Sequence, residues 1–107
     1  MAKIQGPTTA YMNKLKDSEY WQRVRHQVKM RDHFACKICG DQKNIDVHHI
    51  RYNTMTPSGK MTSIIGKELD YLHWTVALCR KCHKEVHADI NHKFNHQNPN
   101  SKPYNHI

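Results

Sequence analysis

The stretch from Cys79 to His87 constrains this chain more than any other, because it combines two metal-binding patterns. Cys79 and Cys82 form a C-x-x-C pair, the spacing with which two thiolates commonly bind one zinc ion. His83 and His87 are four residues apart, which on a helix places both imidazoles on one face. The stretch therefore predicts two metals, one that holds the fold and one that does chemistry.

The cysteine pattern has a partner upstream. Cys36 and Cys39 form a second C-x-x-C pair, and two such pairs can close a four-thiolate zinc site, which is structural because it has no open position. Two disulfides are the alternative, but residues 1–9 contain one large aliphatic residue, Ile4, and hence no secretory signal. A redox C-x-x-C pair would be accompanied by a βαβ pattern, which the sequence lacks. We expect a structural zinc, and a cytoplasmic protein without a membrane-spanning run.

Size and charge add to this picture. The chain has 107 residues, of which only 37% are hydrophobic, so it forms one small domain with a thin core that benefits from a metal staple. Its formal net charge is +8. Such an excess can reflect no more than a soluble basic surface, but beside the metal patterns it favours a polyanionic partner, because phosphate neutralisation dominates nucleic-acid affinity.

The histidine pattern also has a partner upstream. His48 and His49 are adjacent and flanked by Val47 and Ile50, in what we predict to be a short strand. Neighbouring side chains of a strand point to opposite faces, so the two imidazoles cannot easily bind one ion. One can bind a metal while the other faces a substrate and takes a proton from water near pH 7. Two unrelated surface histidines are the alternative.

Three segments are expected: an N-terminal arm over residues 1–17, the folded domain over 18–90, and a polar, Asn-rich, weakly ordered tail over 91–107. The tail carries histidines without fixed spacing to a partner, which we expect in solvent: His92, His96 and His106.

Within the domain, Asp17 or Ser18 begins a helix. Its apolar stripe is expected to enter the core, and consists of Tyr20, Trp21, Val24 and Val28. Its basic residues are either solvated or in contact with phosphates: Arg23, Arg25, Lys29 and Arg31. The other expected elements are a loop over 51–66, a helical turn over 67–74, a strand over 75–78, and a helix from about Lys81 toward Ile90 or Phe94.

The order of these motifs resembles the HNH endonucleases, which are ββα-metal nucleases, in the zinc-knuckle form found in phages and bacteria. The resemblance covers about residues 21–87 and rests on Cys36-x-x-Cys39, Val47-His48-His49-Ile50 and Leu78-Cys79-x-x-Cys82-His83-x-x-x-His87. It implies a small α+β fold: a ββα-metal (HNH) motif stapled by the four-cysteine zinc, with an N-terminal helix and a polar C-terminal tail.

The resemblance also implies roles for the histidines. His48 would bind the catalytic metal together with His83 and, as in the nuclease colicins, His87, while His49 would be the general base. The metal would be Mg²⁺ or Mn²⁺, with Zn²⁺ or Ni²⁺ as alternatives that imidazole ligands favour. Basic residues close to the motifs are predicted to contact DNA, namely Arg51, Arg80, Lys81 and Lys84.

One position departs from the family. The family has an Asn nine residues before the first histidine of the final helix, where it pins the hairpin loop and helps to orient the general base. Here that position is Trp74, whose side chain cannot accept a hydrogen bond. Either the neighbouring His73 replaces the Asn, and is then part of the catalytic set, or Trp74 is a core residue and the role is unfilled.

These features predict a metal-dependent HNH endonuclease that nicks double-stranded DNA with little sequence specificity, as a monomer, a homodimer or part of a larger phage or bacterial complex. The alternative is a zinc-stabilised DNA-binding module with weak or no catalysis, because Trp74 stands at the Asn position. A small zinc protein for protein contacts is a third option, which the charge of +8 argues against.

Overall fold

The computed structural model describes residues 18–104, so the predicted arm over 1–17 and His106 lie outside the described residues. The described part contains helices α2 (Glu19–Arg31) and α3 (Arg80–Ala88) and two antiparallel sheets of two strands each. This confirms the prediction of a small α+β fold. Within residues 18–104, no helix is both long enough and apolar enough to cross a membrane.

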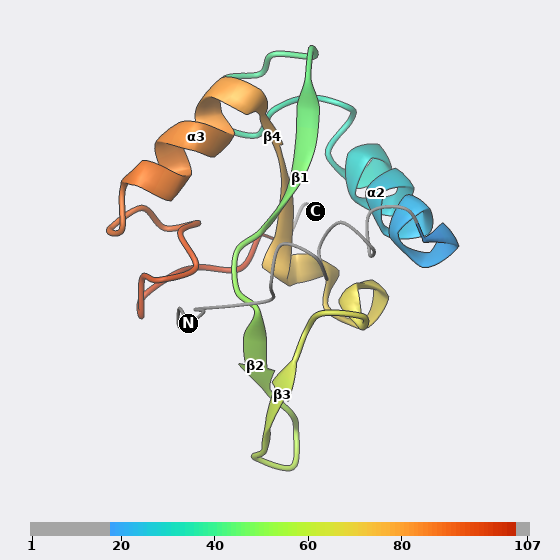
Figure 1. The fold of residues 1–107 in the computed structure, drawn as a ribbon, viewed down its shortest axis with the longest axis vertical. Coiled ribbons are helices and arrows are strands. Elements are labelled where there is room, and N and C mark those ends of the chain that lie inside the picture. Colours follow the sequence, from blue (N-terminus) through green and yellow to red (C-terminus); the bar gives the residue numbers. More distant parts are fainter. Residues whose placement is uncertain (1–17, 105–107) are drawn as a thin grey trace, which may run out of the picture.

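The centre of the molecule is a ribbon of two strands, β1 (Ile45–His49) and β4 (Thr75–Cys79). They pair antiparallel, with Ile45 opposite Cys79 at one end and His49 opposite Thr75 at the other. Figure 1 shows α2 and α3 on opposite sides of this ribbon. Every residue of β4 is buried, so each face of the ribbon has its own core.

The core on one face is built by α2. Ser18 caps the helix, since its hydroxyl oxygen accepts a hydrogen bond from the Trp21 backbone N–H at 3.0 Å. Trp21, Val24 and Val28 are buried and pack with Ala77 of β4. The predicted cap and apolar stripe are confirmed.

The core on the other face is built by α3. Val76 and Leu78 of β4 pack there with Val86 of α3, because side chains alternate along the strand. Ile50 and Phe94 complete the cluster, and full burial of each such side chain contributes about 1.5–3 kcal/mol. Phe94 lies in the segment that the sequence predicted to be a weakly ordered tail.

The structure corrects that prediction for residues 91–104, which pack against the domain in a series of turns. Asn95 is 1% exposed, and its side-chain amide donates to the carbonyl oxygens of Val86 (2.8 Å) and Asp89 (3.0 Å). The Asn98 amide likewise donates to the Asn91 carbonyl oxygen at 3.1 Å. The Asn-rich composition reflects side chains that satisfy backbone carbonyls near the end of α3, where helices leave them unpaired.

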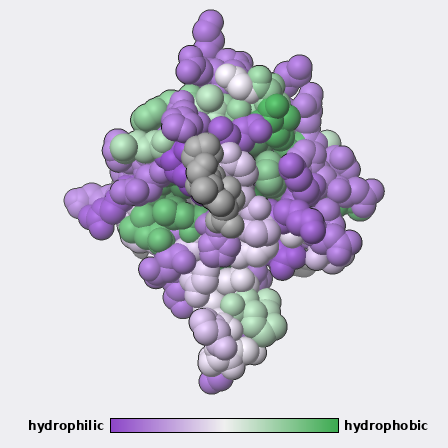
Figure 2. All heavy atoms as spheres, turned by 180° about the vertical axis from the view of Figure 1, so that it is seen from behind, coloured by the Kyte–Doolittle hydropathy of each residue, from purple (hydrophilic) through white to green (hydrophobic). Residues whose placement is uncertain are grey.

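The expected loop over 51–66 contains a hairpin, formed by β2 (Asn53–Met55) and β3 (Met61–Ser63). The hairpin projects from the body of the molecule (Figure 1), and the view from behind shows it as a protrusion coloured mostly white and light green (Figure 2). Met55 and Met61 face each other across it and are 58% and 65% exposed. The strands were not predicted because they are short and lack a buried face.

Two 3-10 turns follow the hairpin, η1 (Glu68–Asp70) and η2 (Leu72–Trp74), where the sequence predicted a helical turn. The helix predicted from about Lys81 begins at Arg80 and ends at Ala88, short of Ile90.

Candidate metal centres

The four cysteines form the first centre. Their sulfur atoms all lie within 4.8 Å of one another, and none is in a disulfide. The Cys39 and Cys79 sulfurs are 3.6 Å apart, close to the roughly 3.8 Å expected of two thiolates on one tetrahedral zinc with bonds of about 2.3 Å. Gly40, at φ 83°, allows the turn that closes the first pair. The thiolate centre, as we call these four residues, is compatible with a structural zinc site.

Backbone amides of the thiolate centre favour the ionised form of one of its sulfurs. The amides of Ile38 and Cys39 donate to the Cys36 sulfur at 3.4 and 3.5 Å. Burial opposes ionisation of Cys36, but these hydrogen bonds, together with those from the Cys79 amide and the Cys82 side chain, outweigh it and lower the pKa of its thiol to about 6. Burial and the neighbouring sulfurs raise the pKa of Cys82. A bound cation would therefore favour ionisation of Cys82 beside the ionised Cys36.

Three histidines form the second centre, which we call the histidine centre. His48, His83 and His87 each offer a ring nitrogen, and these atoms lie within 4.8 Å of one another. The Nε2 atoms of His83 and His87 are 3.1 Å apart, as for two nitrogens that bind one ion at about 2.0–2.1 Å. His48 is buried, His83 is half-buried and His87 is exposed, so the centre opens to solvent on one side.

In two of these rings, a hydrogen bond to a neighbouring residue engages one nitrogen and leaves the other free for an ion. The Phe94 carbonyl oxygen can only accept, so His48 donates to it through Nε2–H at 2.6 Å and keeps Nδ1 as a free acceptor. The Asp46 carboxylate accepts from Nδ1–H of His83 at 3.2 Å, which leaves Nε2 free. Burial lowers the pKa of His48 to about 3, so this ring is neutral at pH 7 and suited to be a ligand.

His49 points to the opposite face from His48, as the alternation of a strand predicts. Its ring stacks on Trp21 at 5.4 Å between centroids with an angle of 12° between the planes, and a second aromatic ring, Tyr52, lies 5.4 Å away. Its Nε2 is 3.0 Å from a carboxylate oxygen of Glu68.

Neither carboxylate beside these histidines was predicted from the sequence. Asp46 precedes His48 by two residues and so shares its face of β1, a signal that the period of a strand could have supplied. Glu68 lies 19 residues after His49, in a different element, and no spacing relates the two.

The structure does not bring the predicted His73 to His49. The His73 ring faces Tyr71 and Trp74, and Trp74 lies against the core with the Arg51 guanidinium 4.8 Å from its ring centroid. Among residues 18–104, neither His73 nor Trp74 forms a hydrogen bond or ring contact with His49. A catalytic role of His73 stays a prediction without a contact to support it.

His96 corrects another expectation. It was expected in solvent, but its ring is half-buried and lies 5.9 Å from His87 and 5.0 Å from Tyr52, measured between centroids. The packed segment 91–104 carries it to the rim of the histidine centre, which no spacing in the sequence indicated. Its buried Nδ1 atom has no hydrogen-bond partner within residues 18–104.

The four residues predicted to contact DNA occupy two kinds of environment. Arg80, Lys81 and Lys84 are exposed on α3. Arg51 is half-buried, and donates to the Ser101 hydroxyl at 2.7 Å and to the Pro99 carbonyl oxygen at 3.0 Å. Its guanidinium is thus directed to the packed segment, and a DNA contact of all four stays a prediction.

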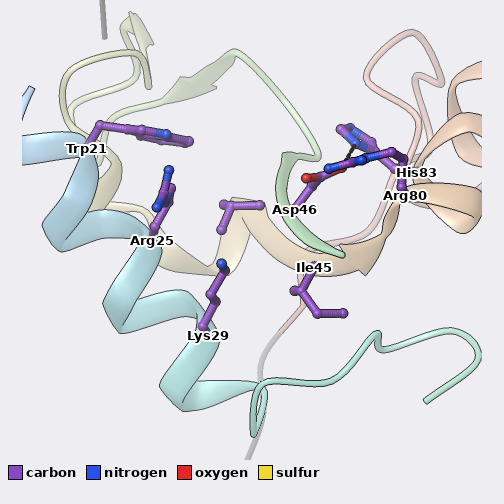
Figure 3. Close-up of a pocket in the computed structure, with 8 residues that line it drawn as sticks. Trp21, Arg25, Lys29, Ile45, Asp46, Arg80 and His83 are labelled. Carbon is purple, nitrogen blue, oxygen red and sulfur yellow. Dashed lines mark hydrogen bonds and ion pairs between the residues drawn. The ribbon is translucent and has the colours of Figure 1, made fainter. Parts of the chain in front are cut away.

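A basic groove with a cavity volume of about 520 Å³ lies beside the histidine centre (Figure 3). Arg25 and Lys29 of α2 line one wall, and Arg80 and His83 of α3 line the other. The carboxylate in the groove, Asp46, is engaged by His83 at 3.2 Å and by Arg80 at 4.0 Å. The Nε atom of Arg25 is buried without a hydrogen-bond partner in the described part of the chain. Three cationic side chains against one carboxylate suit the groove to a phosphate-bearing ligand.

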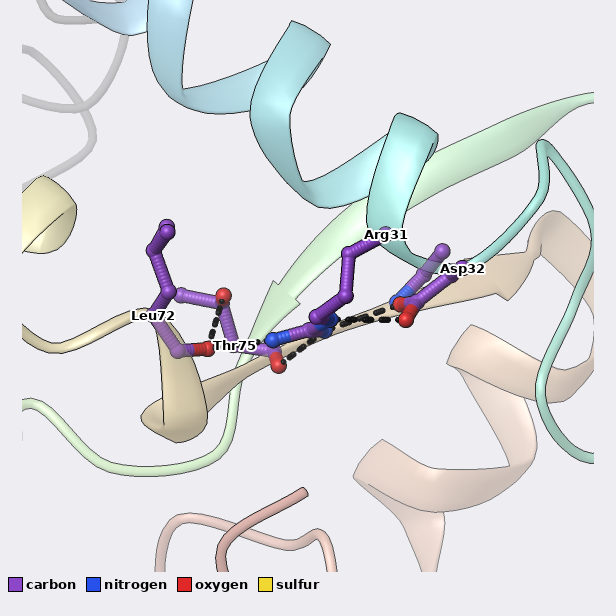
Figure 4. Close-up of polar contacts among 5 residues, drawn as sticks. Arg31, Asp32, Leu72 and Thr75 are labelled. Atoms are coloured by element: carbon purple, nitrogen blue, oxygen red, sulfur yellow. Dashed lines mark hydrogen bonds and ion pairs between the residues drawn. The ribbon is translucent and has the colours of Figure 1, made fainter. Parts of the chain in front are cut away.

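Arg31 differs from the other basic residues of α2, because its guanidinium is used inside the protein (Figure 4). It donates to the carbonyl oxygens of Leu72 (2.7 Å) and Thr75 (2.8 Å) and to both carboxylate oxygens of Asp32. Asp32 is buried and also accepts from the Ala77 backbone N–H at 2.9 Å. These contacts join the end of α2 to the start of β4. From the sequence, Arg31 was expected either in solvent or in contact with phosphates.

Comparisons of the chain with protein-family models, with curated proteins and with solved structures find no match.

Proposed function

We propose that this protein is a metal-dependent DNA endonuclease of the HNH type, which nicks double-stranded DNA with little sequence specificity. The observation that carries the proposal is the pair His48 and His49 at the end of β1. One ring belongs to a group of three imidazoles that is open on one side, and the other is held by a buried carboxylate. A protein that only binds DNA would not need one histidine in a group of metal ligands and its neighbour against a carboxylate.

The histidine centre would hold the divalent ion of the reaction. Its three ring nitrogens and the outer contacts from Asp46 and Phe94 fit such an ion. When bound, Mg²⁺ or Mn²⁺, or alternatively Zn²⁺ or Ni²⁺, would stabilise negative charge on the scissile phosphate. The antiparallel strands β1 and β4 followed directly by α3 support a ββα-metal motif, and the thiolate centre would hold a zinc that keeps it folded.

The remaining steps belong to side chains of the chain. His49 would take a proton from the attacking water through Nδ1, since its Nε2 is engaged by Glu68. Arg25, Lys29 and Arg80 in the basic groove would hold phosphates beside the scissile one. Contacts to phosphates position a duplex without reading its bases, which accounts for the low specificity proposed.

The test is incubation of the full chain with supercoiled plasmid and each of the four ions in turn, with EDTA as the control. We expect nicked circles with at least one ion, and nicking about 10²- to 10⁴-fold slower with His49→Ala. Binding of the plasmid without cleavage under all four ions would instead favour the DNA-binding module. That second candidate has one observation in its favour, since within residues 18–104 neither His73 nor Trp74 forms a hydrogen bond or ring contact with His49.

A further inference from the structure

Glu68 is a buried carboxylate with an unusual pair of partners. It opens the turn η1, is 0% exposed, and forms no ion pair with a Lys or Arg side chain of residues 18–104. One oxygen, Oε2, is 3.0 Å from Nε2 of His49, and the other, Oε1, accepts from the Gly66 backbone N–H at 3.0 Å. Burial of a carboxylate is costly unless hydrogen bonds replace its hydration, so both of these contacts are needed to keep it there.

The contact fixes the proton of His49. An ionised carboxylate can only accept, so Nε2 of His49 carries the hydrogen and Nδ1 carries the lone pair. The stacked Trp21 ring, 12° from parallel to the imidazole, restricts rotation of the imidazole about its Cβ–Cγ bond. Glu68 and Trp21 therefore fix both the tautomer and the plane of the ring.

We propose that Glu68 is the positioning residue for His49, in the place of the Asn whose position Trp74 occupies. The inference rests on the proposed function, because it assigns His49 the task of taking a proton at Nδ1. Glu68 keeps that atom unprotonated before the reaction, and its negative charge stabilises the imidazolium that forms when Nδ1 accepts the proton. In this role Glu68 resembles the acid of a Ser-His-Asp triad, which orients a histidine without being the final proton acceptor.

The substitution Glu68→Gln separates this role from simple packing. A glutamine has nearly the same shape but offers one acceptor oxygen where the carboxylate offers two. The Gly66 N–H needs that oxygen, so the NH₂ group would face Nε2 of His49. Nε2 must then accept, and the proton moves to Nδ1, the atom that has to be free. The equivalent Asp→Asn change in a Ser-His-Asp triad acts through the same wrong tautomer.

Two measurements test the proposal on the full chain. Plasmid nicking by Glu68→Gln is expected to fall about 10²- to 10⁴-fold in kcat, with KM and DNA affinity within about twofold of the parent. Asp70→Asn is the matched control, because Asp70 is an exposed carboxylate of the same turn, and it is expected to nick like the parent. A Glu68→Gln protein that nicks at the parental rate overturns the proposal while leaving the proposed function intact.

The second measurement needs no activity. Nitrogen NMR of the His49 ring, in protein without a divalent ion in the histidine centre, is expected to show hydrogen on Nε2 in the parent and on Nδ1 in Glu68→Gln. Hydrogen on Nδ1 in the parent overturns the proposal whether or not Glu68→Gln folds. A parent that nicks no plasmid under any ion overturns the proposed function and, with it, the catalytic part of this inference, while the tautomer still decides whether Glu68 orients the ring.

Discussion

The thiolate centre and the histidine centre share the β1–β4 ribbon and the helix α3, but they present different surroundings to an ion. The first has four sulfur donors, three of them on buried residues, and backbone amides that point at the sulfurs. The second has three nitrogen donors, one of them on the exposed His87, and a basic groove beside it. A tetrahedral ion is closed off by four protein ligands and keeps a free position with three. The same helix therefore contributes Cys82 to a centre with four protein donors and His83 to a centre with three.

The largest expected effect comes from opening the thiolate centre. Cys39→Ser should unfold the domain, because the free energy of zinc binding, about 10 kcal/mol or more, is mostly folding free energy in so small a chain. Elemental analysis should find one zinc per parent chain, and the variant should show no cooperative melting transition. His83→Ala is the control, since it removes a ligand of the other centre and should melt close to the parent. A parent without zinc, or a Cys39→Ser variant that melts like it, would contradict the structural role.

The next effect separates the two histidines of β1. His49→Ala should lower the nicking rate by about 10²- to 10⁴-fold, the usual cost of removing a general base, while the affinity for the divalent ion stays unchanged. His48→Ala and His83→Ala should lower both, without unfolding the domain. Calorimetry of metal binding beside plasmid nicking gives the comparison. The roles of His48 and His49 must be exchanged if His49→Ala no longer binds the ion and His48→Ala still does.

A smaller effect is expected from the outer contact of the histidine centre. Asp46→Ala should weaken binding of the divalent ion about 10- to 100-fold, because His83 would then lack the acceptor that fixes its tautomer. Glu85→Ala removes an exposed carboxylate from the same helix as His83 and should bind the ion like the parent. The measurement is again calorimetry, on protein whose zinc content has been verified. Equal weakening in both variants would show that only the overall charge matters.

The smallest effect concerns the basic groove. Arg25→Gln should reduce the slope of log affinity against log salt by about 0.9 for each phosphate that the side chain neutralises, measured on duplex DNA without divalent ions. Arg23→Gln is the control on the same helix, where the side chain is exposed and does not line the groove. If the two variants change the slope equally, the DNA does not lie in the groove.

The two centres could be predicted from the sequence because their ligands obey local spacing. The C-x-x-C and i, i+4 spacings bring the residues of each pair together, while the meeting of the two cysteine pairs follows from the common four-thiolate zinc pattern and the place of His48 beside His83 from the resemblance. Helix α2 was predictable for the same reason, since Ser18 and the stripe of Trp21, Val24 and Val28 are local signals. The opposite orientation of His48 and His49 follows from the period of a strand.

The outer contacts could not be predicted, because they join residues that no local pattern relates. Glu68 belongs to a segment whose only readable signal was a helical turn, far along the chain from His49. The partner of His48 is a backbone carbonyl 46 residues away, which carries no sequence signal at all. The Asn-rich composition of residues 91–104 indicated a weakly ordered tail in solvent. In the fold, the side chains of Asn95 and Asn98 donate hydrogen bonds to backbone carbonyls.

The carbonyl oxygen of Phe94 has a consequence for anyone who shortens this chain. A fragment that stops at residue 90 keeps every cysteine and histidine of both centres, yet it lacks the acceptor for His48 and an aromatic side chain of the core. Ser101 and Pro99, which hold Arg51, would be missing as well. The metal ligands alone therefore underestimate the length of chain that the fold needs, because contacts of residues 94–101 extend it at least to Ser101.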